Sequence, residues 1–171
     1  AVLLELIRRY AVDVPFWDQW DVAPFFEHFA RGELTAAELF KPQNEYRQFF
    51  PNLLFLALGW LTRWDVRFEM LVSFALACLV AFLVYRLGKI TVGGGGWQRP
   101  LAFLVSSLLI FSPVQYENWL FGVQVVYFVP VACVACGLVV ARSGLGARAR
   151  FLLCMLLATL STFSSANGLL C

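Results

Sequence analysis

Residues 68–86 read FEMLVSFALACLVAFLVYR, an apolar run long enough to cross the hydrocarbon core of a membrane as a helix. Three further apolar runs follow, at about 100–113, 119–141 and 151–165. In lipid, a helix satisfies all of its own backbone hydrogen bonds, so runs of this kind are expected to be helical. We therefore predict an all-α, polytopic membrane protein with about four membrane helices.

The composition supports the same class of protein. Hydrophobic residues make up 61% of the 171 residues, and aromatic residues make up 16%. Soluble domains are about 45–50% apolar, and a chain of this size cannot bury the excess in its own interior. The formal net charge of only +2 gives no support to nucleic-acid binding.

The distribution of charge predicts an orientation in the bilayer. Two connecting segments carry basic residues and no acid: Arg86, Lys89 and Arg99 around the first, and Arg142, Arg148 and Arg150 around the second. The segment 112–122 between them has Glu117 and neither Lys nor Arg. The positive-inside rule places both basic segments in the cytoplasm and Glu117 on the extracytoplasmic side.

The rest of the chain divides into three parts. Residues 1–10 are expected to be the end of a truncated first membrane helix, because the chain begins without Met in the middle of an apolar pattern. Residues 11–67 are expected to be an extracytoplasmic loop with short and interfacial helices. One of these, at 51–62, has too few apolar residues to span comfortably. Residues 68–171 would form the helix bundle, and we expect the whole to be a fragment.

One acidic motif lies between two apolar runs. Glu117 is the only carboxylate from position 88 onward, in Gln115-Tyr-Glu-Asn-Trp119. An ionisable group in such a place is costly to keep and indicates a functional site. We predict that Gln115, Glu117 and Asn118 face one extracytoplasmic cavity that they share with Asp18 of the first loop. Glu117 is a catalytic candidate there, and Gln115, Asn118 and Gln124 are candidates for binding a donor or an acceptor. The alternative is an ordinary polar loop.

A second acidic place lies in the first loop. Asp18 and Asp21 are three residues apart and would share one helix face, next to Trp17 and Trp20. They are candidates for a carboxylate base held at the membrane surface. The alternative is an interfacial aromatic belt with acids that cap short helices.

A polar cluster precedes the expected interfacial helix. Glu45, Tyr46 and Arg47 are candidates for binding a donor or an acceptor, because the guanidinium of Arg matches phosphate oxygens. The alternative is a solvated turn with a local Glu–Arg pair, which contributes little to stability.

The order of these parts resembles the polytopic membrane glycosyltransferases of the GT-C fold, such as the protein O-mannosyltransferases and the lipid A aminoarabinose transferases. In the resemblance, Asp18 stands at the catalytic aspartate of the first loop. Phe50-Pro51-Asn52-Leu53 stands where many members have His-Pro-Pro-Leu, and Ser112-Pro113 to Glu117 stands at the second acidic motif. The chain is similar to the N-terminal part of a divergent member of that family.

The resemblance implies an enzyme of the cell envelope, in the bacterial inner membrane with its active side extracytoplasmic. Such an enzyme transfers a sugar from a polyprenyl-phosphate donor to a glycan, lipid or protein acceptor, with inversion. Asp18 would be the base, with Asp21 next in line, and Arg47 would stabilise the leaving phosphate. Glu117 would orient the acceptor, or hold a divalent cation together with Asp18.

The rival interpretation is a non-catalytic polytopic membrane protein, either a transporter or a scaffold. A transporter is expected to show charges buried within its spans and a repeat in its hydropathy. We expect spans without charge and find no evident repeat, so this interpretation ranks second.

Overall fold

The computed structural model describes residues 2–43, 47–91, 96–165 and 168. These residues form helices joined by short connections, without a strand, which confirms the predicted all-α class. In chain order the elements are α1 (Val2–Tyr10), η1 (Trp17–Val22), α2 (Ala23–Arg31), α3 (Ala36–Leu39), α4 (Phe49–Thr62), α5 (Arg67–Thr91), α6 (Gln98–Ile110), η2 (Pro113–Gln115), α7 (Tyr116–Leu120), η3 (Gly122–Gln124), α8 (Val125–Ala141) and α9 (Ala147–Thr162).

Three helical stretches are long and apolar enough to cross a membrane. They are Arg67–Thr91, Gln98–Leu120 and Gly122–Ala141, with mean hydropathies of 2.2, 1.2 and 2.3. The fourth expected span, at 151–165, lies in α9, which has 16 residues. At 1.5 Å per residue α9 is about 24 Å long, less than the roughly 30 Å of the hydrocarbon core. The described part of the chain is therefore all-helical, with three stretches long and apolar enough to span a membrane and with shorter apolar helices beside them.

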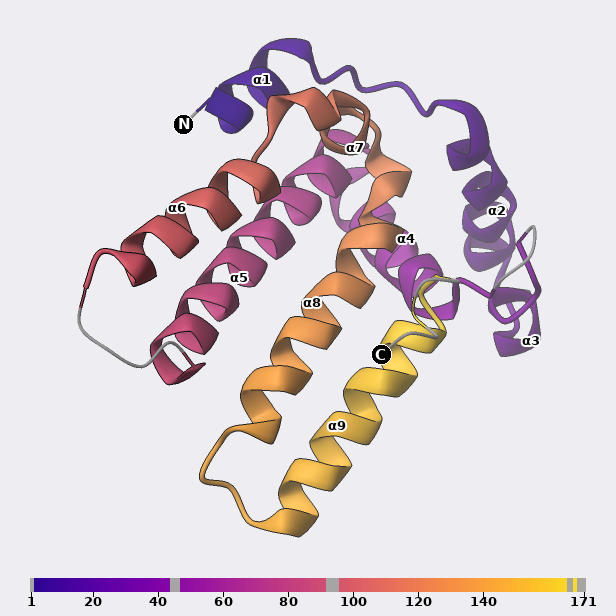
Figure 1. Cartoon of the computed structure of the whole chain (residues 1–171). Helices are drawn as coiled ribbons and strands as arrows, with labels where there is room; N and C mark the ends of the chain where they lie inside the picture. The colour runs from indigo at the N-terminus through magenta and orange to yellow at the C-terminus, as the bar shows by residue number, and fades with distance from the viewer. Residues whose placement is uncertain (1, 44–46, 92–95, 166–167, 169–171) are drawn as a thin grey trace.

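The long helices lie side by side with alternating direction (Figure 1). α5 packs against both α6 and α8, and α8 packs against α9. The connections from α5 to α6 and from α8 to α9 lie at one end of the bundle, while α1 and α7 cover the opposite end (Figure 1). We call the first of these the basic end, because the helix termini there carry Arg86, Lys89, Arg99, Arg142, Arg148 and Arg150.

One core cluster fixes α1 and α7 onto α5. Its buried members are Leu3, Ile7, Val66, Met70, Ala77 and Trp119. Trp119 is fully buried, and its indole N–H donates a hydrogen bond to the backbone oxygen of Ser112 at 3.1 Å. That bond spans the irregular segment after α6, so the short helix α7 is held across the end of the bundle.

α4 is a short apolar helix that begins near the end of α9. It has 14 residues, or about 21 Å, which is too short to cross a bilayer by itself. The amide of buried Asn52 donates to the backbone oxygen of Leu39 at 3.3 Å, and the backbone N–H of Phe50 donates to the oxygen of Phe163 at 3.3 Å. Its placement along the membrane interface stays a prediction.

The turn from α4 to α5 is held by the first loop. Arg63 and Trp64 have left-handed backbones with φ of 57° and 61°. The Trp64 ring packs against Trp20, with ring centres 5.7 Å apart, and against Phe26 at 4.8 Å. These contacts bring η1, which carries the candidate acids of the first loop, to the start of α5.

Candidate functional site at the acidic end of the bundle

η1 is a short 3-10 helix that carries both candidate acids of the first loop. Gln19 stabilises its first turn, because the Gln19 amide oxygen accepts a hydrogen bond from the backbone N–H of Phe16 at 3.2 Å. Trp17, directly before Asp18, has a left-handed φ of 51°, which an aromatic residue adopts only at a cost. Asp18 and Asp21 are both exposed. Strained backbone next to an exposed acid is a feature that functional sites share.

A buried carboxylate anchors η1 to the bundle. The amide nitrogen of Gln19 donates a hydrogen bond to the carboxylate of Glu69 in the first turn of α5, and both residues are only 1% exposed. The backbone of Gly122 in η3 lies against this pair, because a Cβ there would overlap the Glu69 carboxylate and the Gln19 amide. Gln19 therefore joins η1, α5 and η3 at one buried polar point.

Sequence reasoning missed this point. The expectation of spans without charge was wrong for α5, since Glu69 lies inside the stretch that is long and apolar enough to cross a membrane. A detectable signal existed, because an acid at the start of an apolar run is unusual and calls for a partner. No comparable signal distinguished Gln19 from the other polar residues of the first loop.

A polar cavity of about 70 Å³ lies between η1 and the start of α8. It is lined by Asp18, Asp21, Val22, Gln43, Gln48, Phe121, Val123, Gln124, Val126 and Tyr127. The side-chain oxygens of Gln43 and Gln124 are buried and have no hydrogen-bond partner among the described residues. The cavity thus presents two carboxylates and two unsatisfied amide oxygens, all of which are acceptors. It has room for a few water molecules or for the hydroxyl groups of a ligand.

A second cavity of about 220 Å³ lies beside the first and is mostly apolar. Gln115 and Asn118 line it together with apolar residues of α5, α6 and α8. The Asn118 amide donates to the Gln115 side-chain oxygen at 3.2 Å. Tyr127 lines both cavities. The expected single cavity is therefore divided: Gln124 lines the polar cavity with Asp18, whereas Gln115 and Asn118 line the neighbouring apolar one.

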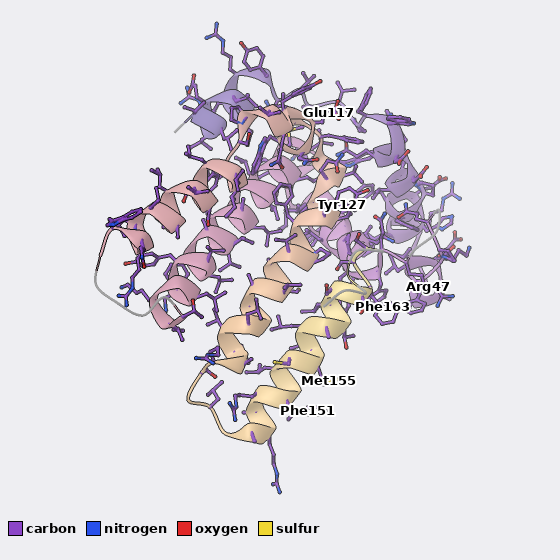
Figure 2. The ribbon with its side chains drawn as sticks, in the orientation of Figure 1. Arg47, Glu117, Tyr127, Phe151, Met155 and Phe163 are labelled. Carbon is purple, nitrogen blue, oxygen red and sulfur yellow. The ribbon has the colours of Figure 1, made fainter. Side chains whose placement is uncertain are left out.

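Glu117 and Arg47 lie apart from each other. Glu117 is exposed at the end of the bundle, where its carboxylate accepts a hydrogen bond from the Tyr116 hydroxyl at 3.3 Å (Figure 2). Arg47 is exposed on the side of the molecule near Phe163, with its guanidinium 4.9 Å from the centre of the Phe40 ring (Figure 2). Arg47 directly precedes Gln48, which lines the polar cavity.

Glu45 and Tyr46 lie outside the described residues. Within the described ranges, no three His, Cys, Asp or Glu side chains gather closely enough to hold a metal ion. A divalent cation between Asp18 and Glu117 therefore stays a prediction without a third protein ligand among those residues.

Comparison of the chain with protein-family models, curated proteins and solved structures found no match.

The chemistry of the polar cavity follows from its acceptors. Carboxylate and amide oxygens accept hydrogen bonds, so a ligand that satisfies them must bring donors. A polyol such as a sugar brings several hydroxyl donors, whereas a phosphate brings acceptors and negative charge. The hydroxyl groups of a sugar can donate to these oxygens and accept from the side-chain amides of Gln43 and Gln124, whereas the two carboxylates repel an anion.

Proposed function

We propose that this chain belongs to a membrane glycosyltransferase that moves a sugar from a polyprenyl-phosphate donor to an extracytoplasmic acceptor. The observation that carries the proposal is the acceptor-rich cavity, which is lined by Asp18, Asp21, Gln43 and Gln124, the last two with side-chain oxygens that lack a hydrogen-bond partner among the described residues. This cavity lies at the end of the bundle opposite the basic end. By the positive-inside rule, that end is extracytoplasmic.

Asp18 is the general base in this proposal. Its carboxylate takes the proton of the acceptor hydroxyl as the acceptor oxygen bonds to the anomeric carbon of the sugar. The bond from that carbon to the phosphate oxygen breaks, and the polyprenyl phosphate leaves with the electron pair. Attack from the face opposite the leaving group inverts the anomeric centre. Asp21, Gln43 and Gln124 orient the sugar through its hydroxyl groups.

The neighbouring apolar cavity supports a donor with a long hydrocarbon chain. A ligand that spans both cavities would place its polar head beside Asp18 and its chain beside Ala77, Val80 and Val131, with Tyr127 between them. Arg47 is the candidate for binding the phosphate. Its guanidinium is exposed, and Arg47 directly precedes Gln48, which lines the polar cavity. Glu117 lines neither of the two cavities and is the candidate for contact with the acceptor.

One observation favours the rival interpretation, a transporter or scaffold. Glu69 is a buried acid within a membrane-length helix, as transport sites require. Glu69 lies in the first turn of α5 and not at its middle, and Gln19 satisfies it. Its position is therefore better explained as an anchor for η1.

The test measures sugar transfer in membranes that contain the protein and a radiolabelled polyprenyl-phosphate sugar. Asp18→Asn keeps the size of the side chain and removes the base, so turnover should fall by a factor on the order of 10² or more. Arg47→Ala should raise KM for the donor. Glu33→Gln, an exposed acid of the same loop, is the matched control and should keep wild-type activity.

The outcomes separate the candidates. Loss in Asp21→Asn with full activity in Asp18→Asn would move the role of base to Asp21. Full activity in both variants, or substrate flux across sealed vesicles without any transfer product, would overturn the enzymatic proposal.

A further inference from the structure

The basic end of the bundle holds a cavity of a different character. It lies between the end of α5 and the start of α6 and measures about 550 Å³, which is within the range of small-molecule sites. Lys89 and Arg99 line it, and so do Val84, Leu87, Ala102 and Phe103. It therefore combines two cations with apolar walls.

The sequence around this cavity contains no acidic residue. The chain has no Asp or Glu from position 70 to position 116, nor any from position 118 to its last residue. Glu69 and Glu117 lie at the opposite end of the bundle, at the start of α5 and in α7 (Figure 1). Lys89 instead stands 4.7 Å from the centre of the Tyr85 ring, which leaves its ammonium able to bind an anion. The positive charges of Lys89 and Arg99 therefore favour an anionic ligand in this cavity.

The surroundings place the cavity at the depth of lipid headgroups. Trp97, at the start of α6, is 71% exposed, and exposed Trp side chains concentrate at the membrane interface. From the cavity, α6 continues as an apolar surface without a buried residue, and Leu104 and Leu108 are 54% and 65% exposed. An acyl chain that begins in the cavity can therefore run along this face.

We propose that this cavity binds an anionic phospholipid such as phosphatidylglycerol. Lys89 and Arg99 bind the phosphate diester. Thr91 and Ser106 also line the cavity and bind oxygens of the headgroup, and the apolar wall contacts the start of an acyl chain. This site is at the opposite end of the bundle from the proposed active site and does not depend on the reaction. It would fix the depth of α5 and α6 in the bilayer.

The test compares two double variants that remove the same charge from the same end of the bundle. Binding of phosphatidylglycerol and of phosphatidylcholine to the purified chain in detergent is measured by native mass spectrometry. Lys89→Gln/Arg99→Gln should weaken phosphatidylglycerol binding on the order of 30-fold, since two basic side chains near the surface are lost. Arg148→Gln/Arg150→Gln, in α9 and outside the cavity, is the matched control and should change binding by less than about threefold, since those two side chains do not line the cavity.

Gly88→Leu fills the cavity and keeps both charges. A Cβ at Gly88 meets no atom within 4 Å, so the substitution is tolerated and its side chain can occupy the space of the lipid. Weaker phosphatidylglycerol binding in this variant supports the site. Equal loss in the two double variants, equal binding of the two lipids, or displacement of the lipid by inorganic phosphate would each overturn the proposal.

Discussion

The substitution Gly122→Ala tests the anchor that joins η1 to the bundle. The new methyl group would overlap the Glu69 carboxylate and the Gln19 amide, and it would lie 3.1 Å from the Cβ of Glu69. Because that Cβ is fixed to the backbone of α5, it can give way only by a small shift of α5 or η3, while the Glu69 carboxylate and the Gln19 amide must rotate away from the methyl group. The substitution therefore forces Gln19 and Glu69 apart or moves η3 away from α5.

Two contributions set the expected loss of folding stability in Gly122→Ala. Overpacking a filled site costs about 1–3 kcal/mol. Separating a buried carboxylate from its hydrogen-bond donor costs about 1–3 kcal/mol more. A combined loss of about 3 kcal/mol lowers Tm by roughly 6–12 °C in a chain of this size.

The measurement is a thermal unfolding curve in mild detergent, followed by circular dichroism. Gly137→Ala is the matched control, because Gly137 lies inside α8 and a Cβ there meets no atom within 4 Å. Ala is favoured over Gly in a helix, so this control should leave Tm unchanged or raise it slightly. A Tm for Gly122→Ala within about 2 °C of wild type would refute the reasoning on overpacking.

A double-variant cycle identifies the partner. In the Glu69→Ala background the overlap with the carboxylate is gone, and Gln19 is no longer held by its hydrogen bond and can turn away from the new methyl group. Gly122→Ala should then lower Tm less than it does in the wild type, although the contact with the Cβ at position 69 remains. An equal decrease in both backgrounds would show that the strain lies elsewhere in η3.

Two further predictions concern topology and pH. In a variant without native cysteines, Ser143→Cys at the basic end should resist an impermeant thiol reagent in intact cells, whereas Asn118→Cys should react; the reverse pattern would contradict the proposed orientation. Hydrogen bonds from the Arg67 guanidinium lower the pKa of Asp65, so Asp65 stabilises the fold above its ordinary pKa of about 3.9, and that contribution is lost as pH falls through the lowered folded value. Asp65→Asn should therefore lower Tm by about 2–4 °C at neutral pH, a small decrease because the Arg67 side chain is exposed. The difference in Tm between the variant and the wild type should disappear in acid. A difference that persists unchanged in acid would contradict this assignment.

The sequence alone determined the fold class, because the relevant physics is local. An apolar run of membrane length must satisfy its backbone internally, so residues 68–86 predict a helix whatever surrounds them. Basic residues at alternate connections likewise predict which helix ends lie together. The structure has α5 over Arg67–Thr91, and its two basic connections lie at one end of the bundle (Figure 1).

Which polar side chains meet was decided only by the tertiary structure. Gln115 and Gln124 are nine positions apart, yet Gln124 lines the polar cavity together with Asp18, whereas Gln115 lines the apolar cavity. Glu117 was the most conspicuous acid in the sequence, and it is exposed, while Glu69 is buried against Gln19. Hydropathy fixes the length of a helix, but the rotation of each helix about its axis follows from packing between residues far apart in the chain. Only that rotation determines which polar groups share a cavity and which face outward.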